Sequence, residues 1–185
     1  IESKKPNNDI TVGDTKYTTS DEETKLIVKP STGSGSEGGE GEEGTGKPEV
    51  ELKKGSVQLP PEGTITLPNG DKVTNSTDPE EGSESVTVSD DNKVRIPAGA
   101  EATLGEGDDA IKVSVPKGEN GEPDSLPAEV TPKEDGSGYE VKAEPGNDVT
   151  IGDETYRIGD YDTTFEVISG EDGKPDIVVT DGGVE

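Results

Sequence analysis

Short runs of alternating apolar and polar residues, separated by turn residues, recur along this chain. The clearest runs span residues 64–67, 85–88, 111–115, 139–141 and 165–167. Alternation with a period of two puts every second side chain on one face, which is typical of a half-buried β-strand. The equivalent apolar residues of these runs, Leu67, Val88, Val113, Val141 and Val167, follow one another at similar spacings. The sequence therefore predicts an all-β fold of short strands with no significant helix.

The turns between the runs support this prediction. Asn69-Gly70 and the segment 90–92 are rich in Gly, Asn and Asp, which adopt a positive φ at low cost. Pro68 and Pro97 directly follow alternating runs, and proline ends a strand ladder because it has no backbone N–H. A second short run follows most turns, as at 93–96, so we expect hairpins.

The core must be thin, because apolar residues make up only 24% of the chain and aromatic residues only 3%. Two architectures fit these values. Stacked rungs or hairpins, as in a β-solenoid, need only two or three inward residues each. The alternative is an immunoglobulin-like β-sandwich with strands at intervals of roughly 8–12 residues. Such sandwiches usually hold a large aromatic residue in the core, whereas residues 55–135 contain none. The stacked arrangement is therefore slightly favoured.

Residues 8–29 and 147–168 align with each other without gaps, which predicts an internal duplication. Identical residues occupy nine of the 22 positions: Asn8/Asn147, Asp9/Asp148, Thr11/Thr150, Gly13/Gly152, Asp14/Asp153, Tyr17/Tyr156, Asp21/Asp160, Thr24/Thr163 and Val28/Val167. Residues 46–52 also match residues 173–179. In each copy this second segment follows the first, and fewer residues separate the two segments in the second copy than in the first. Self-similarity of this kind usually indicates stacked or serial modules. One domain with two similar ends is the alternative.

Residues 31–48 separate the parts of the first copy and consist mainly of Gly, Ser, Thr and Glu. This composition predicts a flexible linker or surface loop. We therefore expect three parts: residues 1–30 as the end of a preceding β repeat unit, 31–48 as the linker, and 49–185 as the main β repeat unit.

The formal net charge of −26 limits the partners that the chain can have. Nucleic-acid binding depends on Lys and Arg neutralising phosphates, and no basic stripe is present. Anionic membrane surfaces repel such a chain, and no apolar run approaches the roughly 20 residues of a membrane helix. We expect neither nucleic-acid binding nor membrane insertion. The partners that the charge allows are divalent cations and basic molecules, or the chain has no partner at all.

The missing residue types exclude several kinds of catalysis. Without His or Cys, neither a Ser-His nor a Cys-His nucleophile can form, and zinc sites built on these residues are excluded. Paired carboxylates cleave glycosides in some enzymes. With 43 acidic residues, however, such pairs are unavoidable and carry no specificity. We expect no enzymatic activity.

Calcium is the one metal that the composition suggests, because it binds six to eight carboxylate and carbonyl oxygens on irregular loops. The candidate ligands are Asp90, Asp91, Asp108, Asp109, Asp153, Asp160 and Asp162. The last three recur as Asp14, Asp21 and Glu23 in the first copy. No EF-hand spacing is present, and solvated turn carboxylates are the simpler interpretation.

Two further features have a structural and a functional interpretation. Tyr17 and Tyr156 occupy matching positions beside Gly-Asp turns. A buried ring with its hydroxyl near solvent is favoured over a carbohydrate-stacking ring. Asn75-Ser76-Thr77 has the form of an N-glycosylation site, and chance explains such a tripeptide.

Segments 65–70, 94–99 and 149–153 resemble the repeat regions of large Gram-positive (Firmicutes-type) cell-surface and adhesin proteins, in which short Val/Thr/Ile strands alternate with Pro-x-Gly turns. The resemblance is one of style, and it implies a secreted, extracellular or cell-surface location. The expected function is a non-catalytic structural or adhesive module, a stalk or spacer. The alternative is a calcium- or carbohydrate-binding surface module. Its partners would be host or cell-wall glycan, or neighbouring repeats of the same chain.

Overall fold

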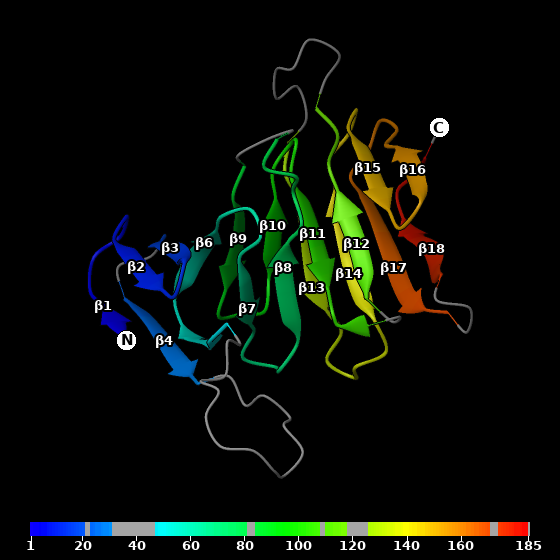
Figure 1. Ribbon diagram of the computed structural model, residues 1–185. Helices are drawn as coiled ribbons and strands as arrows, with labels where there is room; N and C mark the ends of the chain where they lie inside the picture. Colours follow the sequence, from blue (N-terminus) through cyan, green and yellow to red (C-terminus); the bar gives the residue numbers. More distant parts are fainter. Residues whose placement is uncertain are drawn as a thin grey trace.

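The computed structural model describes residues 1–20, 23–30, 47–80, 84–107, 110–117, 126–170 and 174–184. These residues form eighteen β-strands in two sheets of nine strands each, without an α-helix (Figure 1). The prediction of an all-β fold is therefore confirmed. None of the described segments forms a helix with the length and hydropathy needed to span a bilayer.

The two sheets are named here by their strands in spatial order. Sheet A consists of β1 (Glu2–Ser3), β4 (Thr24–Lys29), β5 (Glu49–Lys54), β7 (Thr64–Thr66), β8 (Lys72–Asn75), β11 (Glu101–Leu104), β12 (Ile111–Ser114), β15 (Asp148–Ile151) and β16 (Glu154–Arg157). Sheet B consists of β18 (Pro175–Asp181), β17 (Thr163–Ser169), β14 (Tyr139–Ala143), β13 (Ala128–Pro132), β10 (Val94–Ile96), β9 (Val86–Ser89), β6 (Ser56–Leu59), β3 (Thr15–Thr19) and β2 (Asp9–Val12).

Successive hairpins alternate between the two sheets. The hairpins β2–β3, β9–β10, β13–β14 and β17–β18 lie in sheet B, whereas β4–β5, β7–β8, β11–β12 and β15–β16 lie in sheet A. From β7 to β18, each hairpin lies in the sheet opposite the next hairpin in the chain and pairs edge to edge with the one after that. The structure combines the two predicted architectures, because hairpins stack in chain order while the two sheets face each other as in a sandwich.

The pattern has one irregular place, at β6. This strand has no hairpin partner of its own and pairs on both sides with other elements, β3 and β9. In the facing sheet, β5 and β7 run parallel and share a single register pair, Glu51 with Thr66. All other strand pairs are antiparallel.

The core is one layer of inward side chains between the sheets. The five apolar residues that recur in the sequence, Leu67, Val88, Val113, Val141 and Val167, are all fully buried. Val, Ile, Leu and Ala fill the middle of the layer, and the aromatic residues Tyr17, Tyr139 and Phe165 are buried towards its ends. Alternation within each strand is thus sufficient to build the core, because a single layer needs only every second residue.

Asn75 joins the two sheets through hydrogen bonds in the interior. It lies at the end of β8 and is fully buried. Its Nδ2 donates to the carbonyls of Leu59 and Glu84, at 2.9 Å each, and its Oδ1 accepts from the amide of Thr77 at 3.1 Å. Both side-chain hydrogens are therefore used, so the glycosylation-like tripeptide presents no accessible amide nitrogen in this fold.

The two segments that align in sequence adopt matching structures at opposite ends of the stack. We name β2–β5 the N-terminal unit and β15–β18 the C-terminal unit. Gly13 and Gly152 have φ values of 60° and 62°, and Gly55 and Gly182 have 85° and 82°. The two units lie in exchanged sheets, since β2–β3 belongs to sheet B and β15–β16 to sheet A. Residues 1–30 and 49–181 contribute strands to both sheets, and residues 31–46 of the expected linker lie outside the described residues.

The turns at Gly55 and Gly182 are equally tight. A Cβ atom at Gly55 would lie 2.4 Å from the carbonyl oxygen of Glu23 and 2.7 Å from Oγ1 of Thr24. At Gly182 the same atom would lie 2.3 Å from the carbonyl oxygen of Asp162 and 2.6 Å from Oγ1 of Thr163. Each turn therefore requires glycine for two reasons, the positive φ and the close approach of the backbone.

Replacing Gly55 with Ala is expected to lower the free energy of unfolding by about 3 kcal/mol, since the left-handed backbone and the overpacking each contribute roughly 1–2 kcal/mol. Gly70 is the matched control: its φ is 99°, and nothing lies within 4 Å of a Cβ there. Gly70→Ala is expected to lose about 1–2 kcal/mol, from the backbone alone. Denaturant unfolding measures both values, and equal losses would contradict the role of the close approach.

Candidate functional site

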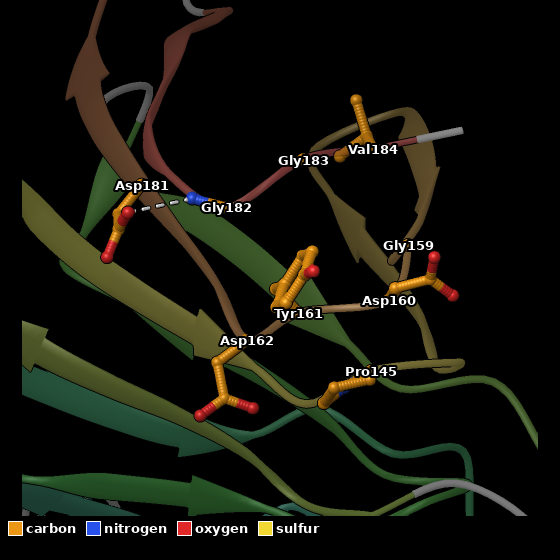
Figure 2. A pocket seen from close by; sticks show the side chains of 9 residues that line it. All are labelled: Pro145, Gly159, Asp160, Tyr161, Asp162, Asp181, Gly182, Gly183 and Val184. Atoms are coloured by element: carbon orange, nitrogen blue, oxygen red, sulfur yellow. Dashed lines mark hydrogen bonds between the residues drawn. The ribbon is translucent and has the colours of Figure 1, made fainter.

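A wide, shallow depression opens at the C-terminal end of the stack. Its lining residues are Pro145, Gly159, Asp160, Tyr161, Asp162, Asp181, Gly182, Gly183 and Val184 (Figure 2). They come from the loop before β15, the loop between β16 and β17, and the segment after β18. Three carboxylates and one tyrosine ring thus meet at the edge of the two sheets.

Hydrogen bonds to Thr163 fix the backbone of this depression. The Thr163 side chain is fully buried, and its hydroxyl oxygen lies 3.0 Å from the carbonyl oxygen of Gly183 and accepts from the Gly183 amide at 3.1 Å. The amide of Gly182 donates to Oδ1 of Asp181 at 3.0 Å, as Figure 2 shows. The Tyr161 ring is left 76% exposed.

The corresponding place in the N-terminal unit has a different charge. There Glu23 forms an ion pair with Lys54, which lowers the pKa of Glu23 and raises that of Lys54. Asp162 and Asp181 occupy the matching positions when the two sequence alignments of the units are continued to these residues. An acid–base pair in one unit is therefore replaced by two acids in the other, which makes this end of the molecule strongly negative.

The structure brings together only two of the predicted calcium ligands, Asp160 and Asp162. Asp153 lies apart from them, in the exposed turn between β15 and β16. Asp108 and Asp109 lie outside the described residues.

Asp90 and Asp91, in the turn between β9 and β10, bind backbone amides. Oδ2 of Asp90 accepts from the Gly55 amide at 2.8 Å, and the Asp90 amide donates to the Gly55 carbonyl at 2.9 Å. Oδ1 of Asp91 accepts from the amide of Lys93 at 3.3 Å. Asp90 therefore fastens the tight turn after β5 to a neighbouring hairpin.

In the described part of the chain, no three His, Cys, Asp or Glu side chains group closely enough to hold a metal ion. The calcium hypothesis stays a prediction. Sequence reasoning missed two residues of the depression, Asp181 and Tyr161. Asp181 could have been found from its alignment with Lys54, whereas nothing in the sequence marks Tyr161 as exposed.

The two tyrosines at matching positions lie in different environments. Tyr17 is only 3% exposed, and its hydroxyl donates to the carbonyl of Thr64 at 2.8 Å, across to the facing sheet. Tyr156 is half-buried, donates to Oε2 of Glu154 at 2.5 Å, and has its ring centroid 5.1 Å from that of Phe165. Both rings pack on the core, as the favoured interpretation expected, but the Tyr17 hydroxyl bonds a backbone carbonyl of the facing sheet and does not reach solvent.

In comparisons with protein-family models, with curated proteins and with solved structures, nothing matched this chain.

Alkaline pH is expected to destabilise the fold through its tyrosines. Burial raises the pKa of Tyr139 from its ordinary 10.0 to about 12, and burial together with the bond to Glu154 raises the pKa of Tyr156 to about 12. A raised pKa means that the folded state favours the neutral phenol. The stabilisation is therefore complete below pH 10 and is lost as the pH rises towards 12.

Tyrosinate absorbance and circular dichroism, followed together over this pH range, measure the effect. Tyr139→Phe removes one of the ionising groups, so its stability is expected to fall less steeply with pH. Ionisation of all four tyrosines near pH 10 with the fold intact would contradict the prediction.

Proposed function

We propose that this chain is a non-catalytic structural module, a spacer that holds attached parts of an extracellular or cell-surface protein at a fixed separation. The observation that carries the proposal is the placement of the two ends. The first strands, β1 and β2, lie at one end of the two-sheet stack, and β16 and β18 lie at the other (Figure 1).

The stack fixes this separation through backbone hydrogen bonds. Eight strand-to-strand spacings separate β1 from β16 in sheet A, and at about 4.8 Å each they place these strands about 38 Å apart. Every hairpin contacts only its neighbours in the stack, as in repeat proteins, so length grows with each unit without a larger core. A chain poor in apolar residues is suited to this way of building length.

The proposed repeat character rests on the matching units. The two units have the same glycine conformations. The close approach of Gly55 to Thr24 in one unit matches that of Gly182 to Thr163 in the other. We infer that the two units are copies of one ancestral repeat. The resemblance of segments 65–70 and 94–99 to Gram-positive surface repeats supports a bacterial surface protein, and the high negative charge favours solubility outside the cell.

The rival function is a calcium- or carbohydrate-binding surface module. The observation in its favour is the exposed Tyr161 ring between Asp160 and Asp162, because sugars stack on exposed aromatic rings and calcium binds carboxylates. The spacer is preferred because it accounts for the whole stack, whereas the rival accounts for one end of it.

A spacer is expected to hold its two ends at one distance. The chain contains no cysteine, so Glu2→Cys and Glu154→Cys provide two unique sites for spin labels, on β1 and β16. Pulsed electron paramagnetic resonance is expected to give a single narrow distance of about 40 Å, set by the strand spacings between the two sites. The same labels at Glu2→Cys and Lys25→Cys, on paired strands, are the short-distance control. A broad distribution for the long pair would overturn the proposal.

The spacer is also expected to be indifferent to calcium beyond ionic screening. Millimolar calcium chloride should change the melting temperature no more than sodium chloride of equal ionic strength, because at a net charge of −26 any salt reduces self-repulsion. A specific rise that Asp160→Asn and Asp162→Asn abolish would favour the rival function. A glycan array read with the same variants tests its carbohydrate form.

A further inference from the structure

The two matching units correspond strand by strand. The strands β2, β3, β4 and β5 of the N-terminal unit correspond to β15, β16, β17 and β18 of the C-terminal unit. The register is also the same, since Leu26 pairs with Leu52 and Phe165 pairs with Val179. Both of these strand pairs contain a register shift at the same place, directly before Leu26 and directly before Phe165. The likeness therefore extends to an irregularity that an all-β fold does not by itself require.

The strands on one side of the two units correspond as well. β1 pairs antiparallel with β4, and β14 pairs antiparallel with β17. On the other side, β6 begins directly after Gly55 and pairs antiparallel with β3. Gly182 is the counterpart of Gly55, so the residues that follow it show whether the C-terminal unit continues in the same way.

Residues 183 and 184 do take the course of β6. An isolated bridge joins Ile158 to Val184, and the matching residues Thr19 and Val57 are register partners. The amide that follows Ile158 donates to the carbonyl that precedes Val184 at 3.0 Å, and the amide that follows Thr19 donates to the carbonyl that precedes Val57 at 2.8 Å. The last described residues therefore begin a strand that matches β6, beside β16.

This correspondence explains the exposed valines at that end of the molecule. Val179 and Val184 are 39% and 41% exposed, whereas their counterparts Leu52 and Val57 are fully buried. In the N-terminal unit, β7 lies beside β5 and β9 lies beside β6, and both are later strands of the same chain. The exposed valines thus have the positions of core residues in a stack that the same polypeptide continues, and they do not define a docking surface for a separate molecule.

The number of elements in one repeat determines in which sheet the next repeat begins. From β6 to β18 the chain forms seven elements, the lone strand β6 and six hairpins. These elements alternate between the sheets, beginning with β6 in sheet B and ending with β17–β18 in sheet B. The eighth element therefore falls in sheet A, where residues 183 and 184 already lie beside β16. Because the number is odd, the same unit lies in exchanged sheets, as β2–β3 in sheet B and β15–β16 in sheet A show.

We propose that residues 55–181 form one complete repeat of a continuous β stack, which a further repeat of the same polypeptide extends with the two sheets exchanged. The lone strand β6 is the element that makes the repeat odd and so causes the exchange. Residues 31–46 join β4 to β5, and because these two strands pair with each other, the stack continues without that segment. Stacks in which each repeat contacts only its neighbours can be extended in this way without a larger core.

The repeat has a defined length and a defined rotation. Its thirteen strands are shared between two sheets, so each repeat adds six and a half strand spacings on average, or about 31 Å at about 4.8 Å each. Exchange of the sheets turns the next repeat by half a turn about the stack, in addition to the twist of the sheets. Arg95, Glu129 and Lys142 form a row across the outer face of sheet B, and their copies would face the opposite side in the next repeat. The proposal thus goes beyond the spacer function, because it states how repeats join and which way their surfaces face.

A longer chain, made of residues 1–180 followed by a second copy of residues 54–185, tests the proposal. Since Gly55 corresponds to Gly182, this joint keeps the tight turn in register. The joint also places Lys54 of the added copy where Asp181 stood. Asp162 therefore gains the ion-pair partner that Glu23 has in the N-terminal unit.

Spin labels measure whether the longer chain forms one stack. Labels at Glu2→Cys and at Glu154→Cys of the added copy are expected to give a single narrow distance of about 70 Å, the sum of about 38 Å in the natural chain and about 31 Å for the repeat. Glu154→Cys of the first copy, with the same label at Glu2→Cys, is the control and is expected to give about 40 Å. A broad long distance would overturn the proposal, and so would loss of the control distance, because a fitting continuation keeps the first copy folded. The spacer function falls only if the natural chain itself lacks a single distance.

Disulfide formation in the longer chain tests the exchange of sheets. Arg157 corresponds to Thr18, which pairs with Gln58. Arg157→Cys and Gln58→Cys of the added copy are therefore expected to form an intramolecular disulfide, since residues opposite each other in antiparallel strands have Cα atoms about 4.5–5.5 Å apart, within disulfide range.

Val178→Cys, on the exposed side of β18, is the matched control. It is expected to form no disulfide with Gln58→Cys of the added copy, because that β6 lies beside β18 only if it stays in sheet B. A disulfide to position 178 would contradict the exchange of sheets. No disulfide to either position would contradict the continuous stack.

Discussion

A single layer of small apolar side chains between two sheets is the constraint on which the structure depends. With 24% apolar residues, this chain cannot fill a thick core, and most of its buried side chains are Val, Ile, Leu and Ala. Alternating hairpins solve the problem, because each strand supplies only every second residue to the layer. The stack then becomes longer without becoming thicker. The same constraint explains why polar cross-links such as Asn75 occur inside: in a thin layer, the backbone of one sheet lies within reach of a side chain from the other.

The acidic residues lie on the outside, where some form ion pairs with lysines and others accept hydrogen bonds from backbone amides in turns. Lysines bridge neighbouring strands, as Lys29 does to Glu51 at 3.1 Å and Lys93 to Glu129 at 3.2 Å. Exposed pairs of this kind contribute roughly 0.2–1 kcal/mol each, so they direct register more than they hold the fold together. Other carboxylates bind backbone amides, as Asp90 does at Gly55 and Asp135 does at Ser137. The hydrogen bonds from the Ser137 hydroxyl and amide lower the pKa of Asp135, which keeps that turn carboxylate ionised.

Much of the local structure could be predicted from the sequence, because the alternation of apolar and polar residues is itself local. The five recurrent apolar residues are fully buried, and the turns at Asn92 and Gly70 have the positive φ that their residue types indicate. The assignment of hairpins to alternating sheets could not be predicted, since either sheet buries the same residues. The position of strand β6 and the hydrogen bonds between Asp90 and Gly55 could not be predicted either. Both depend on contacts between segments that are distant in the chain. At the C-terminal depression, Asp160 and Asp162 had been candidates for calcium binding, which stays a prediction. Asp181 was not a candidate, although its alignment with Lys54 marks the position.

The ends of such a stack are its weakest points, because an open sheet edge exposes both unsatisfied backbone groups and the side of the core layer. The two ends of this molecule meet the problem differently. At the N-terminal end, Ile10 and Val12 are only 6% and 8% exposed, and Lys16 pairs with Asp9 at 2.7 Å on the strands of the edge hairpin. At the C-terminal end, Val179 and Val184 are exposed beside three carboxylates. Like charges repel, so these carboxylates disfavour contacts between two such edges, which is how charged side chains on an edge strand limit edge-to-edge pairing.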